Sequence, residues 1–149
     1  MKRALDCIVK IVACTLLSML ATSVITIIWA IIDCIPDWPS YMVYMSRFDR
    51  FISEFIDLLP TALLFGLFIS PSIIIYYGLV FFRKSHKAKT IGYVLPIVGW
   101  GIYLVACIIL DAQRQSSEGA GEMATVILIN DFIAGAVVYV LMSKVKWLQ

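Results

Sequence analysis

The chain has 149 residues, of which 62% are hydrophobic and only 15% charged, and its formal net charge is +2. A soluble domain is about half apolar and about a quarter charged, so the composition argues against a soluble globular protein and equally against a disordered one. The length predicts one domain over 1–149, and the clustering of apolar residues predicts that this domain lies in a membrane.

Four long apolar runs predict four transmembrane helices. They cover 11–32, 58–82, 91–110 and 123–143, and the first three contain no charged residue. About 20 residues at 1.5 Å each cross the ~30 Å hydrocarbon layer. Backbone groups in lipid must be satisfied within the segment, so each run is expected to be helical. The predicted fold class is therefore all-α, a polytopic membrane protein.

Lysine and arginine are distributed unevenly around these runs. Nine of the twelve precede the first run, separate the second from the third or follow the fourth, whereas eight of the ten acidic residues lie on the other side. The positive-inside rule therefore predicts cytoplasmic termini. The loop 83–90 is expected on the same side, where anionic headgroups explain its basic residues without nucleic-acid binding: Arg83, Lys84, Lys87 and Lys89.

The segment 41–57, between the first two runs, predicts an amphipathic helix on the outer face. Aromatic and apolar side chains recur there at steps of three and four residues: Tyr41, Tyr44, Met45, Phe48, Ile52 and Phe55. Such a helix lies at the membrane interface or covers the bundle. The alternative is a docking surface for a partner.

Few residues could support catalysis or hold a metal. The sequence has one histidine and four cysteines, and no cysteine pair has C-x-x-C spacing. We therefore expect no enzyme, no metal site and no cofactor. Cys34 and Cys107 fall near the outer ends of two runs, where a disulfide is conceivable, but a free cysteine packs like a small hydrophobe and we expect that role.

The fourth run, "VILINDFIAGAVVYV" (126–140), contains Asn130 and Asp131 within an apolar sequence. A central aspartate costs about 2.5–3.5 kcal/mol to insert, which the surrounding apolar residues can offset. An aspartate that faces lipid is not expected. Asp131 is predicted to face the bundle interior, where loss of hydration favours the protonated carboxyl.

Hydroxyl groups on the first run offer partners for this pair. Thr22 lies at the depth of Asp131, and Ala134 with Gly135 provides a small surface for close helix approach. We therefore predict that the first and fourth helices pack through the Asn-Asp pair and four hydroxyl side chains on one face: Thr15, Ser18, Thr22 and Thr26.

The third run has a tryptophan at its centre, an unusual depth for this residue. Trp100 is expected to fill space inside the bundle and to donate its N–H to a neighbour. Pro71 and Pro96 are candidates for kinks in the second and third helices.

The architecture resembles that of the immunity proteins of pore-forming colicins. Four helices with cytoplasmic termini, a longer first outer loop, a short basic inner loop and the polar pair of "ATVILINDFIAGAVVYV" (124–140) carry the resemblance, which covers most of the chain. It implies a bacterial inner-membrane protein that engages toxin helices before a pore opens. The implied contact surfaces are Asn130, Asp131 and the 41–57 stripe.

Two classes of function remain open. In the first, the chain binds another membrane-inserted protein, with homo-oligomers also compatible with the sequence. In the second, it is a small transporter or channel in which Asp131 binds a proton or cation.

Overall fold

The computed structural model describes residues 2–34, 47–114 and 120–149, and these residues form helices without any strand. The elements are α1 (Lys2–Cys34), α2 (Arg47–Phe68), α3 (Ser70–Phe81), α4 (His86–Arg114) and α5 (Ala120–Lys144). Four stretches are long and apolar enough to cross a membrane: Lys2–Ile32, Phe51–Phe81, His86–Gln113 and Ala124–Lys144. The all-α class and the four spans are confirmed, and the chain is an integral membrane protein.

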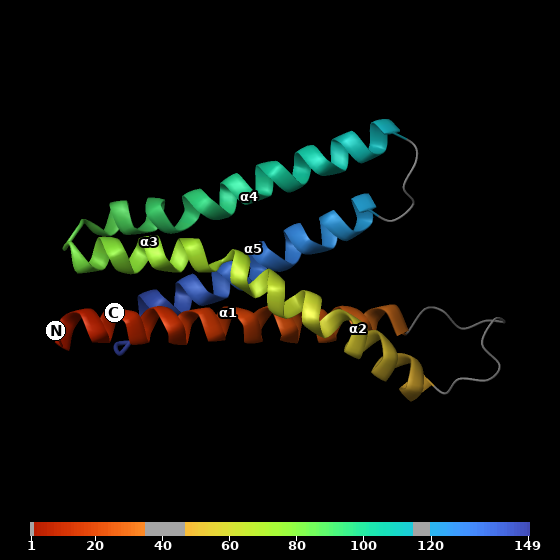
Figure 1. Cartoon of the computed structure of the whole chain (residues 1–149), viewed down its shortest axis with the longest axis horizontal. Coiled ribbons are helices and arrows are strands. Elements are labelled where there is room, and N and C mark those ends of the chain that lie inside the picture. The colour runs from red at the N-terminus through yellow and green to blue at the C-terminus, as the bar shows by residue number, and fades with distance from the viewer. Residues whose placement is uncertain (1, 35–46, 115–119) are drawn as a thin grey trace.

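Both termini and the α3–α4 turn lie at one end of the bundle, which we call the termini end (Figure 1). The C-terminal ends of α1 and α4 and the N-terminal ends of α2 and α5 lie at the opposite end, which we call the loop end. Helix α1 packs along α2, α3 and α5, whereas α4 packs on α3 and α5. As a result the α1–α2 pair and the α4–α5 pair diverge toward the loop end (Figure 1).

The second span is interrupted, because α2 ends at Phe68 and α3 begins at Ser70. Pro71 occupies the first turn of α3, where its missing N–H is tolerated and its ring prevents the helix from continuing unbroken from the preceding turn. The carbonyl of the buried Ile69 instead accepts a hydrogen bond from Ser72 N at 3.0 Å. The predicted kink at Pro71 is confirmed, whereas α4 continues through Pro96.

The basic loop is shorter than predicted. Arg83 adopts a positive φ of 57°, and the N–H groups of Arg83 and Lys84 donate to Val80 O and Leu79 O at 3.0 and 2.9 Å, which is a Schellman ending of α3. Helix α4 then begins at His86, so the prediction of a loop over 83–90 is wrong for Lys87 and Lys89. The reason is a cap that the prediction overlooked: Ser85 Oγ accepts from Ala88 N at 3.4 Å.

The outer amphipathic segment is only partly described. Tyr41, Tyr44 and Met45 lie outside the described residues, as does the side chain of Phe48. From Arg47 onward the segment is helical and continues into the second span without a break. Ile52 and Phe55 are half-buried, and the Phe55 ring stacks on Phe51 with centroids 6.2 Å apart.

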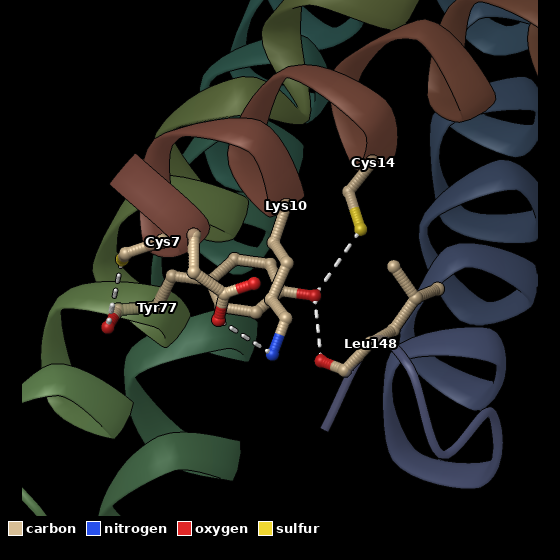
Figure 2. A network of polar contacts seen from close by, with 6 residues as sticks. Cys7, Lys10, Cys14, Tyr77 and Leu148 are labelled. Carbon is tan, nitrogen blue, oxygen red and sulfur yellow. Dashed lines mark hydrogen bonds and ion pairs between the residues drawn. The ribbon is translucent and has the colours of Figure 1, made fainter. Parts of the chain in front are cut away.

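The C-terminal residues close the termini end of the bundle (Figure 2). The Tyr77 hydroxyl donates to Leu148 O at 2.8 Å and lies 3.4 Å from Cys14 Sγ. The Leu148 side chain is buried, whereas its neighbour Trp147 is exposed. The hydroxyl of Tyr77 thus joins α1, α3 and the segment after α5. The Tyr77 ring also packs edge-on against Tyr76, which belongs to a cluster of tyrosine rings.

Candidate functional site

Four side chains form a polar centre in the middle of the bundle: Thr26 of α1, Trp100 of α4, and Asn130 and Asp131 of α5. Asn130 Nδ2 donates to Thr26 Oγ1 at 3.2 Å, and Trp100 Nε1 donates to Asp131 Oδ2 at 2.8 Å. Consecutive residues of a helix point about 100° apart, so Asn130 and Asp131 serve different neighbours. The polar pair therefore ties α5 to α1 and to α4 at one level.

This centre is almost sealed and is incompletely hydrogen-bonded. Asn130 and Asp131 are each 2% exposed. Among the described residues, neither Asn130 Oδ1 nor Asp131 Oδ1 has a hydrogen-bond partner. A buried polar atom without a partner costs about 1–3 kcal/mol and is rare in native structures. Two such atoms on adjacent residues distinguish this position from the other buried polar groups of the chain.

The predicted packing of the first and fourth helices is confirmed, but the hydroxyl groups are used differently. Ser18 Oγ donates to Gly66 O at 2.7 Å and Thr22 Oγ1 to Ala62 O at 2.8 Å, both on α2. Thr15 bonds the carbonyl of Ile11 in its own helix. The expected pairing of Thr22 with Asp131 is therefore wrong, because Thr22 faces α2.

A pattern of small residues on α2 explains why the hydroxyl groups face that helix. A Cβ atom at Gly66 would lie 2.7 Å from Met19 N and closer still to Met19 Cα, so α1 and α2 touch through their backbones. Ala62, one turn earlier, is fully buried. Ala62 and Gly66 form a small-xxx-small pattern, which the sequence contains and the prediction missed.

Gly135 also faces a different helix from the one predicted. A Cβ there would lie 2.9 Å from Ile97 Cδ1, and Gly135 O accepts a hydrogen bond from the Tyr93 hydroxyl at 2.8 Å. Both contacts come from α4. Gly135 therefore allows close approach of α4 rather than α1.

Trp100 donates its N–H to a neighbour, as predicted. Its indole ring also stacks on Phe68, with centroids 4.3 Å apart and planes at 16°, and on Tyr103 at 5.3 Å. Phe68 is the last residue of α2. One side chain thus connects Asp131 to the interruption of the second span.

Comparison of the chain with protein-family models, with curated proteins and with solved structures finds no match. Within the residues that the structure describes, no three His, Cys, Asp or Glu side chains gather as metal ligands would. Cys107 is a free thiol. The chemistry that the polar centre offers is hydrogen bonding and the binding of a proton by one carboxyl group.

Proposed function

We propose that this chain acts by binding another membrane-inserted protein through the faces of its helices. The supporting observation is the divergence of the α1–α2 and α4–α5 pairs toward the loop end (Figure 1). Association in lipid depends on close packing and on hydrogen bonds, because lipid tails compete equally for apolar side chains. An incoming helix gains most where it can pack against more than one helix at once.

The exposed apolar side chains of α2 suit this role. On α2, Ile56 and Leu64 are 60% and 59% exposed, and the half-buried Phe55 continues the aromatic stripe. The polar centre lies where the two pairs meet and is sealed, so its part in binding is to hold α4 and α5 in place rather than to touch the partner.

The resemblance to immunity proteins of pore-forming colicins suggests which class of partner the chain binds. In that proposal the chain resides in a bacterial inner membrane with both termini cytoplasmic, the loop end faces the periplasm, and the partner is the inserted helical domain of a toxin. The basic residues at the termini end agree with this orientation through the positive-inside rule.

The experiment is a protection assay. The chain is expressed in a sensitive bacterium, which is challenged with a panel of purified pore-forming colicins while potassium efflux is recorded. We expect protection against one toxin of the panel. Leu64→Trp on α2 is expected to weaken it, whereas Leu95→Trp, at a 66% exposed position in the first half of α4, is the matched control. Protection against no toxin, with the chain present in the membrane, contradicts the proposal.

One observation favours the second candidate, a proton or cation pathway: the Oδ1 atom of Asp131 has no partner among the described residues. Flux into liposomes that contain the purified chain separates the two functions. A flux that disappears in Asp131→Asn supports transport, whereas no flux above that of empty liposomes favours the binding function.

A further inference from the structure

We propose that Asp131 is a proton-binding site and that its proton controls the stacking of Trp100 on Phe68 at the interruption of the second span. This inference concerns the state of the bundle itself and does not depend on which partner the chain binds.

The carboxyl group of Asp131 is held on one side only. Oδ2 accepts the hydrogen bond from Trp100 Nε1 at 2.8 Å, whereas Oδ1 is buried without a partner among the described residues. Lys10 pairs with Asp6 near the start of α1, and the other described basic side chains of α1 and α4 also lie at the termini end. A carboxylate at this depth is therefore uncompensated, and a proton on Oδ1 removes the charge.

No described titratable group on the helices packed around Asp131 supplies a positive charge that would stabilise its ionised form. The Tyr93 hydroxyl donates to Gly135 O, Tyr103 stacks on Trp100 and contacts Cys107, and Cys14 contacts Tyr77. Asp57 of α2 is exposed. None of these groups is a base that carries positive charge. A metal ion would need several oxygen ligands, and the described residues contain no acidic cluster that supplies them. A proton fits the site because it needs one oxygen.

The protonation state of Asp131 affects α2 through the Trp100 side chain. A hydrogen bond to an ionised acceptor is roughly twice as strong as one to a neutral acceptor, so protonation loosens the hold of Asp131 on the indole. The same indole stacks on Phe68 at 4.3 Å. Phe68 ends α2, and the following Ile69 is 1% exposed, so a moving indole acts on the point where the second span is already broken.

The test combines two readouts on the native chain in bicelles. Fluorine NMR follows fluorinated tryptophans, with the Trp100 resonance identified by its loss in Trp100→Phe. Infrared spectroscopy follows the carbonyl band of a protonated carboxyl group. Across the pH range in which the helical circular dichroism is unchanged, we expect both signals to titrate with one common midpoint, while the Trp147 resonance stays constant.

Two variants complete the test. Asp131→Asn is expected to abolish both transitions, and Asp57→Asn, at an exposed acid of α2, is expected to leave them unchanged. The proposal is overturned by a Trp100 resonance that does not depend on pH in the native chain, by transitions with different midpoints, or by transitions that survive in Asp131→Asn. If Asp131→Asn does not fold, the proposal is judged from the native chain alone, by whether the Trp100 and carboxyl signals titrate with one midpoint.

Discussion

Replacement of Gly66 by alanine tests the contact between α1 and α2 directly. The added Cβ would lie 2.7 Å from Met19 N, and backbone atoms cannot rotate away as a side chain can. The helices must separate, which typically costs about 1–3 kcal/mol for overpacking. The separation also stretches the hydrogen bonds from Ser18 to Gly66 O and from Thr22 to Ala62 O, each worth about 0.6 kcal/mol in a membrane. Because alanine favours a helix by up to about 1 kcal/mol over glycine, we expect Gly66→Ala to lower the free energy of unfolding by about 1–3 kcal/mol.

The measurement is reversible unfolding in mixed micelles, followed by circular dichroism. Gly99→Ala is the control, since a Cβ at Gly99 meets nothing within 4 Å and alanine favours a helix by up to about 1 kcal/mol over glycine. We therefore expect the two variants to shift stability in opposite directions. Equal stability of Gly66→Ala and Gly99→Ala would refute the close backbone contact.

Three further predictions follow from single contacts. Thr26→Val leaves Asn130 Nδ2 without its acceptor and should cost about 1–3 kcal/mol of unfolding free energy; Thr125→Val, at an exposed hydroxyl, should cost less, and equal losses would contradict the buried bond. Arg83→Gly relieves a φ of 57° and should stabilise the chain by about 1 kcal/mol in thermal unfolding; a loss of stability would contradict the left-handed turn. Tyr77→Phe removes the donor to Leu148 O, so maleimide should reach the buried Cys14 faster in a chain without other cysteines; an unchanged rate, equal to that of Tyr103→Phe, would show that this bond does not close the termini end.

The number of spans was predictable because it depends on one quantity that the sequence carries locally. A run such as 91–110 is long and apolar enough to cross a bilayer whatever its neighbours are. The burial of Asp131 was predictable for a similar reason, since lipid excludes an aspartate regardless of the fold. The packing of the first helix against the fourth was predictable from their polar side chains, but the matching by depth chose Thr22, whereas Asn130 bonds Thr26.

The direction in which each helix faces was not predictable in the same way. Thr22 can bond any nearby acceptor, and the choice of Ala62 O depends on how closely α2 approaches. That approach is set by Gly66, which lies 44 positions away along the sequence. Likewise Trp100 was expected to donate to a neighbour, but the identity of that neighbour required the rotation of α4 about its axis. The rotation of a helix about its own axis is set by its contacts with neighbouring helices, and the hydropathy of one segment does not report those contacts.

The physical demands of a bilayer explain why so few polar contacts determine this bundle. Apolar side chains pack as well against lipid as against each other, so they cannot by themselves select one arrangement of helices. Among the described residues, selection rests on close approach and on buried hydrogen bonds. Gly66 and its hydroxyl partners join α2 to α1, Asn130 joins α5 to α1, and Asp131 joins α4 to α5. Among the described residues, α4 is joined to α5 by Asp131, by the Tyr93–Gly135 contact, by the hydroxyl groups of Thr90 and Tyr139 and by the bond from Gly121 N to Asp111. The side chain that is most costly to place in the membrane is thus one of those that hold α4 to α5. A change in its charge acts on the helix pair whose position relative to α1–α2 the proposed partner would sense.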